Sequence, residues 1–110
     1  LAVNTVKDPS KYGVVETRGG WVVRIIEKPR NPSTNLTFAS MAVFGSSIFD
    51  AAGKIPKDPV KGEYYLTDAI NLLIRSGGKV AYVPLDTWRL NINTPEDIEE
   101  ARRFLEGRNP

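Results

Sequence analysis

The 110-residue sequence contains no cysteine, no histidine and no glutamine. Without cysteine the chain forms no disulfide bond and offers no thiolate to a metal ion, which fits a cytoplasmic protein. The lack of these three residue types is also compatible with a heat-adapted source. Its apolar runs are too short to span a membrane, and its first residues do not have the layout of a signal peptide. We therefore expect no membrane partner.

The charge balance is weakly basic and gives no evidence for a nucleic-acid surface. Lys and Arg exceed Asp and Glu by 15 to 13, and 41% hydrophobic residues with 25% charged residues are ordinary for one soluble domain. The isoelectric point is about 9.0. A nucleic-acid surface would gather its basic residues on one face among aromatic side chains. Here they are dispersed, which favours a mixed, solvated surface and no nucleic-acid partner. They include Lys7, Lys11, Arg18, Arg24, Lys28, Arg30, Lys54, Lys57 and Lys61.

The most informative segment is a predicted β-hairpin. Residues 13–16 and 21–28 are rich in β-branched residues and flank a turn at residues 17–20 that ends in two glycines. The second strand ends in Glu27 and Lys28, which place a carboxylate beside an ammonium group. Such a pair can bind the hydroxyls and the phosphate of one ligand. Taken alone, it is more typical of an exposed surface pair than of a binding site.

Three further segments predict strands, and two predict short helices. The strands are residues 1–6, residues 38–44 and residues 79–85, of which the second is an apolar run typical of a strand covered on both faces. A helix begins at Ser46 or Ser47 and ends near Gly53. A Pro- and Lys-rich loop covers residues 54–63. Thr67 then caps a helix that ends at residues 77–78. Its buried face consists of Ile70, Leu73 and Ile74.

The last helix has the clearest start. Thr94 is a capping residue, and the proline and two acids that follow complement the exposed amides of a first turn. Gly107 ends the helix. Its predicted buried stripe consists of Ile98, Ala101, Phe104 and Leu105.

These elements predict an α/β fold with a mixed β-sheet, a β-hairpin and two to three helices. The opening strand has no turn before it, and few helices must cover five or six strands. An open α/β sheet is normally covered on both faces. We therefore expect residues 1–110 to form the C-terminal half of a larger domain.

Four motifs give the sequence a resemblance to a known family. They are residues 8–16 (DPSKYGVVE), residues 27–29 (EKP), residues 62–70 (GEYYLTDAI) and residues 93–97 (NTPED). Together they resemble sugar-1-phosphate nucleotidyltransferases, such as glucose-1-phosphate thymidylyltransferases and N-acetylglucosamine-1-phosphate uridylyltransferases. Each motif alone is weak, but all four occur in the family's order and extend over nearly the whole chain. The resemblance implies a Rossmann-like nucleotide-diphospho-sugar transferase domain.

The resemblance implies that this chain supplies the sugar-phosphate side of the active site. Glu27 would accept hydrogen bonds from sugar hydroxyls, and Lys28, the implied catalytic residue, would pair with the phosphate. The main chain of Gly13 would approach the sugar. The partners are a sugar 1-phosphate and a nucleoside triphosphate, and the latter binds mainly through a half that lies N-terminal to this region in the family. We expect the chain alone to be inactive.

Four further residues correspond to positions of the family's sugar-phosphate pocket. Lys61 matches an arginine that reaches phosphate, although lysine lacks the bidentate fork. Asn35 and Ser40 fall on a strand that lines the sugar, and Ser40 replaces a glycine that is usual there. Trp88 would stack on the sugar or fill the core. Thr67 and Asp68 are better explained by helix capping than by catalysis.

The resemblance also implies a Mg²⁺ cofactor. In the thymidylyltransferases the segment that matches residues 88–94 carries an aspartate that binds magnesium, and here that position is Asn91. In the uridylyltransferases an asparagine is the ligand, which makes Asn93 the first candidate and Asn91 the second. An amide oxygen can bind Mg²⁺ but brings no charge. Two asparagines in a turn before a capped helix are an equally good explanation.

A second function class stays open at this point. A non-catalytic module of the same fold, used for regulation or assembly, would also retain these motifs, and the missing acidic metal ligand leaves room for it. The Glu27–Lys28 pair favours the enzyme. A homo-oligomer is compatible with either function, and the identity of the sugar and of the base is left open.

Overall fold

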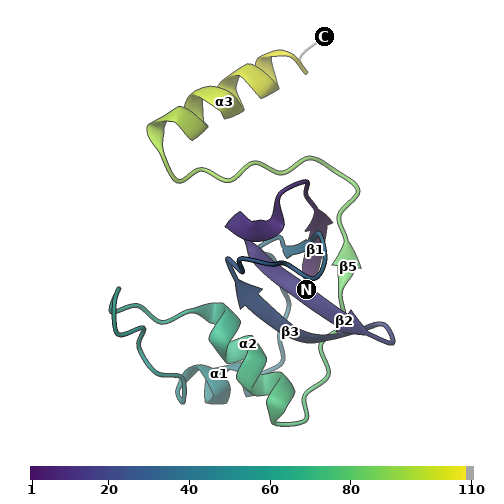
Figure 1. The fold of residues 1–110 in the computed structure, drawn as a ribbon, viewed down its shortest axis with the longest axis vertical. Helices are drawn as coiled ribbons and strands as arrows, with labels where there is room; N and C mark the ends of the chain where they lie inside the picture. The colour runs from purple at the N-terminus through teal and green to yellow at the C-terminus, as the bar shows by residue number, and fades with distance from the viewer. Residues whose placement is uncertain (109–110) are drawn as a thin grey trace.

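The computed structural model describes residues 1–108, which form a five-stranded mixed sheet with three α-helices and one short 3-10 helix (Figure 1). The strand order in the sheet is β3-β2-β4-β1-β5; β1 pairs with β5 in parallel, and the other pairs are antiparallel. The elements are β1 (Ala2–Thr5), η1 (Pro9–Lys11), β2 (Gly13–Arg18), β3 (Trp21–Glu27), β4 (Leu36–Phe38), α1 (Ser47–Ala52), α2 (Leu66–Arg75), β5 (Val83–Pro84) and α3 (Pro95–Glu106). Within this part of the chain no helix is long and apolar enough to cross a membrane.

The predicted hairpin is confirmed. β2 and β3 pair from Gly13 opposite Glu27 to Arg18 opposite Trp21, with an irregularity between Glu16 and Thr17. The turn consists of two glycines, with φ of 59° and 85°. A two-residue hairpin turn needs positive φ at both positions, which glycine adopts without steric cost. The turn places Arg18 opposite Trp21. The irregularity after Glu16 shifts the pairing by one residue, and this shift brings Glu27 opposite Gly13.

Both predicted strands after the hairpin are shorter than the sequence indicates. The strand predicted at residues 38–44 ends at Phe38, because Ser40 has a φ of 59° and the extended backbone cannot continue through it. Beyond Phe38, the Ala39 amide still donates a hydrogen bond to the Ala2 carbonyl, and the Ala2 amide donates one to the Met41 carbonyl. Val43, however, is 97% exposed. Of the strand predicted at residues 79–85, only β5 and a single bridge at residue 81 form. An apolar run becomes a strand only where it meets a hydrogen-bonding partner.

α2 begins before the predicted cap. The helix starts at Leu66 with Tyr65 at the capping position, and no side-chain hydrogen bond caps it. Thr67 lies inside the first turn and is 6% exposed, so its prediction as the cap was wrong. α1 has the predicted bounds, although Ser46 makes no capping hydrogen bond either. Thr67 is placed by packing rather than by capping.

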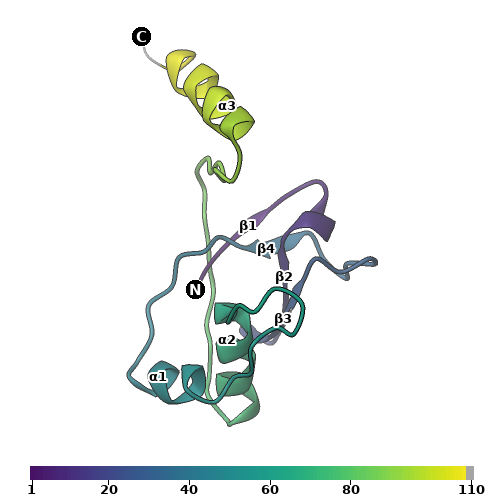
Figure 2. The same cartoon turned by 90° about the vertical axis from the view of Figure 1, so that its left-hand side faces the viewer.

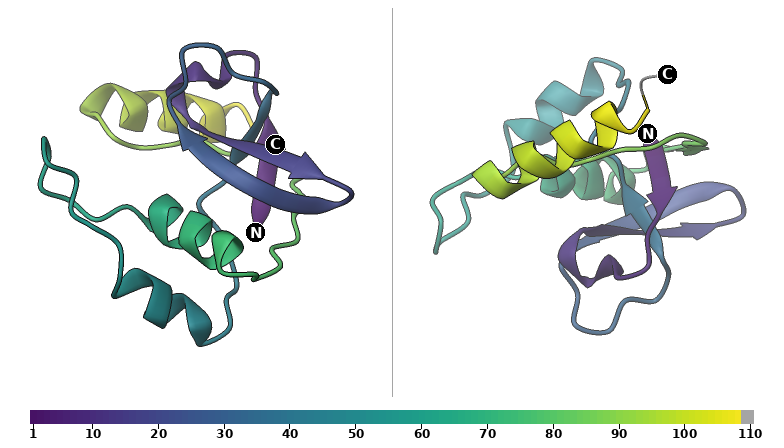
Figure 3. Two further views of the ribbon diagram at one scale, coloured as in Figure 1. Left: turned by 60° about the horizontal axis from the view of Figure 1, so that its bottom comes forward. Right: turned by 90° about the horizontal axis from the view of Figure 1, so that it is seen from above.

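The core lies between one face of the sheet and the helices α1 and α2. α2 packs against β3 on the hairpin side of the sheet, and α1 packs against α2 on the side away from the hairpin (Figure 3). The side chains that meet there are almost entirely aliphatic, as close packing of a small core requires. They are Val3, Val15, Val22, Ile25, Phe38, Ile48, Ala51, Ala69, Ile70 and Val80.

α3 lies apart from this core, at the end of an extended segment that follows β5 (Figure 2). The helix has no buried residue, and Ile98 is 50% exposed. The predicted burial of the stripe at positions 98, 101, 104 and 105 is therefore wrong for residues 1–108. Phe104 packs instead on Trp88, with ring centroids 4.9 Å apart. The spacing of apolar residues in this helix correctly predicts that one of its faces is apolar, but it does not predict what packs against that face.

The predicted start of α3 is confirmed in detail. The Thr94 hydroxyl accepts a hydrogen bond from the Asp97 amide, and the Asp97 carboxylate accepts from the amides of Asn93 and Thr94 at 2.8 and 2.9 Å. This reciprocal arrangement satisfies amides that a helix start otherwise leaves unpaired. The same hydrogen bonds, those from Asn93 and Thr94 first, lower the pKa of Asp97 from its usual value of 3.8.

Acidification is expected to loosen the start of α3. A carboxylate with a lowered pKa stabilises the folded form above its usual pKa, and this stabilisation is lost as the pH falls through the lower, folded value. Carbon-13 shifts of α3 should therefore lose helical character below about pH 4 in a titration from neutral to acidic pH. Asp97→Ala should remove this transition and lower the helicity of α3 at neutral pH. Glu99→Gln, a change at another carboxylate of α3, should leave the transition in place, and a transition that survives in Asp97→Ala would contradict the assignment.

Candidate functional site

Several of the predicted site residues meet at one cavity beside the start of β2 and the end of β3. The cavity has a volume of about 160 Å³ and contains three predicted site residues from the main fold, Gly13, Glu27 and Ser40. The extended segment before α3 adds Asn91 from the other side. The complete lining is Lys11, Tyr12, Gly13, Glu27, Phe38, Ser40, Arg89 and Asn91.

A second cavity of about 290 Å³ adjoins the first and shares four of its lining residues. The predicted metal ligand Asn93 lies here, together with the carboxylates of Asp97 and Glu100. The complete lining is Lys11, Tyr12, Arg89, Leu90, Asn91, Asn93, Asp97 and Glu100. The two cavities therefore connect the hairpin residues to the asparagine segment, which lies more than sixty positions later in the sequence.

The Glu27 carboxylate lies directly over the main chain of Gly13. A Cβ atom added to Gly13 would lie 3.0 Å from Oε1 of Glu27 and 3.3 Å from Cγ2 of Ile25. The first of these distances is at the limit of what side chains tolerate, so a larger residue at position 13 would displace the carboxylate. The glycine therefore has a role that goes beyond entry into a strand. Its missing side chain leaves room for Glu27 at the cavity.

Two of the predicted site residues have a backbone conformation that only glycine adopts easily. Lys28 has a φ of 45° and Ser40 a φ of 59°, and they are the two non-glycine residues with positive φ in the described part of the chain. Such a conformation costs on the order of 1–2 kcal/mol and persists where the surroundings impose it. The Lys28 amide donates to the Tyr12 carbonyl at 2.9 Å, which fixes the chain at that turn. The strain at Ser40 also explains why glycine suits this position.

Four predicted site residues do not line either cavity: Lys28, Asn35, Lys61 and Trp88. The main chain of Asn35 accepts a hydrogen bond from Val6 at 3.1 Å, just before β4. The amide of Lys61 donates to the Asp58 carboxylate at 3.0 Å in the loop before α2. Trp88 stacks on Phe104, with the Arg108 guanidinium 5.3 Å from its ring centroid. Trp88 does not fill the core, because it is 44% exposed and packs on α3, and its stacking on a sugar stays a prediction.

Sequence reasoning missed three polar residues of this region. Lys11 and Tyr12 belong to the quoted motif at residues 8–16, and Arg89 belongs to the segment at residues 88–94, so the motifs contained the signal. The two cations line the cavity together with Glu27 and give it a mixed charge. Such a set of groups can bind an anionic ligand that also carries hydroxyls.

Tyr65, a fourth residue that was missed, lies near Glu27 at the start of α2. It is half-buried, and burial together with the nearby carboxylates of Asp58, Glu63 and Glu27 raises the pKa of its hydroxyl from 10.0, an effect that Lys61 partly offsets. The only signal in the sequence was its position in the motif at residues 62–70, two residues before Thr67.

The candidate metal ligands at the site are the amide oxygens of Asn91 and Asn93, with two carboxylates in the same cavity. Within residues 1–108, no group of three or more His, Cys, Asp or Glu residues could hold a metal ion. Asn91 and Asn93 share a cavity with Asp97, but the Asp97 carboxylate is engaged by two backbone amides. The donor set suits a Mg²⁺ ion that receives most of its charged ligands from a phosphate-bearing substrate.

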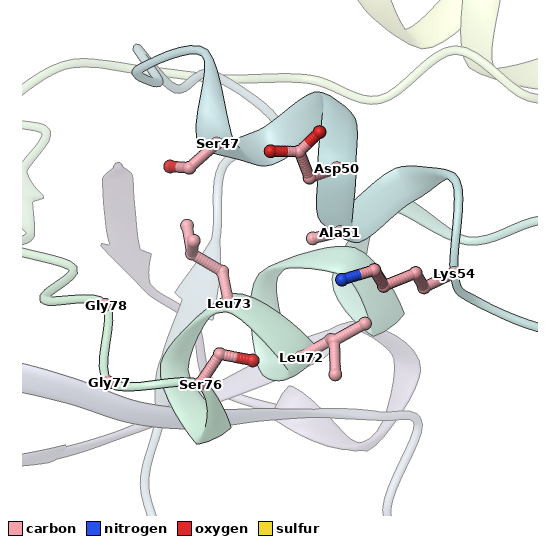
Figure 4. Close-up of a pocket in the computed structure, with 9 residues that line it drawn as sticks. All are labelled: Ser47, Asp50, Ala51, Lys54, Leu72, Leu73, Ser76, Gly77 and Gly78. Atoms are coloured by element: carbon pink, nitrogen blue, oxygen red, sulfur yellow. The ribbon is translucent and has the colours of Figure 1, made fainter.

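A separate cavity of about 360 Å³ lies between α1 and α2 (Figure 4). Its walls carry Ser47, Asp50 and Lys54 on one side and Leu72, Leu73 and Ser76 on the other. None of the predicted site residues lines it, and no buried polar side chain in the described chain lacks a hydrogen-bond partner there or elsewhere. The candidate site is therefore the one beside Glu27.

The chain belongs to the nucleotidyl transferase family, whose model matches residues 1–108. The UTP–glucose-1-phosphate uridylyltransferase AglF of Haloferax volcanii is 39% identical over 100 residues, which are 90% of this chain and 41% of that protein. The bifunctional protein GlmU of Methanocaldococcus jannaschii is 37% identical over 106 residues, 96% of this chain and 26% of that protein. The chain thus spans well under half the length of these relatives.

A solved structure confirms the predicted fold class. The UTP-bound UGPase from Acinetobacter baumannii superposes with a TM-score of 0.78 at 21% identity, over 99% of this chain and 40% of that one. The resemblance inferred from the four motifs is confirmed by the family match and by the relatives.

Proposed function

We propose that this chain provides the sugar-phosphate side of a sugar-1-phosphate nucleotidyltransferase site. The observation that carries the proposal is the position of the Glu27 carboxylate over the Gly13 main chain, at a cavity that Ser40 and Asn91 also line. The complete reaction converts a nucleoside triphosphate and a sugar 1-phosphate into a nucleoside-diphosphate sugar and pyrophosphate. A phosphate oxygen of the sugar phosphate attacks the α-phosphorus, and pyrophosphate leaves with the electron pair of the broken P–O bond.

Different residues bind the sugar and the phosphate of the ligand. The exposed carboxylate of Glu27 accepts hydrogen bonds from sugar hydroxyls, and the free backbone at Gly13 allows the ring to approach closely. Lys28 pairs with the phosphate, and Lys11 and Arg89 add positive charge at the cavity. The reaction brings two anions together, so fixed cations lower its barrier electrostatically.

Mg²⁺ would be held by the amide oxygens of Asn93 and Asn91 together with oxygens of the substrate phosphates. When bound, the ion supplies positive charge that screens the phosphates from one another. Asp97 contributes indirectly, because its hydrogen bonds to the amides of Asn93 and Thr94 fix the backbone that carries these side chains. Asn93 is the first candidate ligand and Asn91 the second.

An NMR titration of the chain with glucose 1-phosphate tests the proposal. We expect the amide shifts to change mainly at Gly13, Glu27 and Ser40, and Mg²⁺ to add changes at Asn91 and Asn93 that Asn93→Ala reduces more than Asn91→Ala does. Glucose 6-phosphate has the same charge with the phosphate moved, and it should bind more weakly. Equal binding of the two esters, or shifts spread over the surface, would contradict the site. Pyrophosphate release by this chain alone would contradict the expectation that it is inactive by itself.

A non-catalytic module for regulation or assembly is the second candidate. The observation that favours it is the absence, within residues 1–108, of an acidic cluster able to hold a metal ion. The same titration separates the two, because a module that has lost the site should not distinguish glucose 1-phosphate from glucose 6-phosphate.

A further inference from the structure

The outer edge of the hairpin is bound by a single side chain from α2. β3 is the first strand in the sheet order, so its outer edge has no neighbouring strand along most of its length. At Ile25 the side chain of Asn71 takes that place. The Ile25 amide donates to Oδ1 of Asn71 at 2.8 Å, and Nδ2 of Asn71 donates to the Ile25 carbonyl at 2.8 Å. One carboxamide thus satisfies both backbone groups of one residue, as a paired strand would.

This contact lies two residues before Glu27. Alternate residues of a strand point to the same side, so fixing Ile25 also restricts the orientation of Glu27. On the inner edge, Gly13 pairs with Glu27, and the Lys28 amide donates to Tyr12 at 2.9 Å. The end of β3 is therefore fixed from both edges, on the inner one by β2 and on the outer one by α2.

The helix that carries Asn71 packs against the strand that carries Glu27, although no residue of the helix lines the two cavities. Tyr65 lies immediately before its first turn. The carboxamide is the hydrogen-bonded link between this helix and the strand. A change in this link would move α2 relative to the end of β3.

We propose that Asn71 is a positioning residue of the sugar-phosphate site, whose carboxamide fixes α2 to β3 so that Glu27 stays over the Gly13 main chain. This inference rests on the proposed function. Its competitor is a purely structural role, in which Asn71 only protects the exposed edge of β3 from pairing with another chain. The two roles predict different results when the carboxamide is removed, because only the positioning role changes ligand selectivity.

The test compares Asn71→Ala, Asn71→Asp and Val80→Ala by titration with glucose 1-phosphate and with inorganic phosphate. Asn71→Ala should bind glucose 1-phosphate about tenfold more weakly, because a misplaced Glu27 no longer meets the hydroxyls, while its affinity for inorganic phosphate stays unchanged. Asn71→Asp keeps the acceptor for the Ile25 amide but sets a carboxylate against the Ile25 carbonyl, so it should not restore binding. Val80→Ala removes core contacts away from the cavity and controls for general destabilisation.

A second measurement makes the result independent of ligand binding. In the wild-type chain we expect a nuclear Overhauser contact between the Gly13 α-protons and the Glu27 γ-protons, and Asn71→Ala should weaken it. An unchanged contact with unchanged selectivity would overturn the role of Asn71 and leave the proposed function intact. A wild-type chain that does not bind glucose 1-phosphate would overturn the proposed function. The Overhauser contact would then decide alone whether Asn71 positions Glu27.

Discussion

Glu27→Gln is expected to weaken the binding of glucose 1-phosphate by roughly twofold to thirtyfold. A hydrogen bond to a charged group contributes about 1.5–3 kcal/mol, against about 1 kcal/mol for a neutral pair, and glutamine exchanges a carboxylate oxygen for a donor that sugar hydroxyls meet less well. The substitution preserves the shape of the side chain and so preserves its position over Gly13. Calorimetric titration of the folded variant measures the loss directly.

Glu16→Gln is the matched control for this experiment. Glu16 lies on the other strand of the same hairpin, where its carboxylate pairs with Arg24 and accepts a hydrogen bond from Ser33 at 2.6 Å. The Arg24 guanidinium and the Ser33 hydroxyl lower the pKa of this carboxyl, so it is charged at neutral pH, yet it does not line the cavity. We expect Glu16→Gln to bind as the wild-type chain does. Equal losses in both variants would mean that the hairpin as a whole, rather than Glu27, supports binding.

Local chemistry was sufficient to predict the elements whose partners are near in sequence. The two glycines of the hairpin turn, the Thr94–Asp97 capping pair and Gly107 each act on residues a few positions away, and their structural consequences could be stated from the sequence. For these features the sequence-based prediction and the structure agree, because one short-range geometry determines both. The position of Glu27 opposite Gly13 is different, because it depends on the irregularity between Glu16 and Thr17, which the prediction did not include.

Predictions that depended on a distant partner were less accurate. The run at residues 38–44 has the composition of a buried strand, but its pairing ends at Phe38 and Val43 is almost fully exposed. The stripe on α3 has the correct period, but periodicity does not identify what covers it. Thr67 was assigned as a cap from its residue type, whereas burial places it inside the helix. In each case the sequence encodes a preference, and tertiary contacts decide how it is satisfied.

The candidate site combines both kinds of information. The hairpin that carries Gly13 and Glu27 is local and was predictable, and the resemblance supplied these two residues, Asn91 and Asn93 as candidates. That Asn91 lies at the same cavity as Glu27 is a tertiary arrangement that neither spacing nor residue type specifies. The same is true of Asn71, whose carboxamide reaches Ile25 across 46 positions of sequence. No motif indicates such a contact.

Ile70→Ala is expected to lower the free energy of unfolding by about 2–5 kcal/mol, the usual cost of truncating a fully buried aliphatic side chain. Ile70 is 0% exposed and lies in the core cluster where α2 packs against the sheet. Because domains of this size have a total stability of about 5–15 kcal/mol, this single change should remove a large part of it. Urea unfolding followed by circular dichroism measures the difference.

Ile98→Ala makes the same chemical change on α3 and distinguishes the structure from the sequence-based prediction. Ile98 belongs to the stripe that periodicity predicts to be buried, but it is 50% exposed, so its truncation should change the free energy of unfolding by about 0.5 kcal/mol or less. Both residues are isoleucines inside helices, so helix propensity affects the two variants alike, and the difference between them reports burial alone. Similar losses in both would show that α3 packs on the core in solution. Because α2 packs on the core and α3 lies apart from it, we expect a large loss of unfolding free energy in Ile70→Ala and almost none in Ile98→Ala.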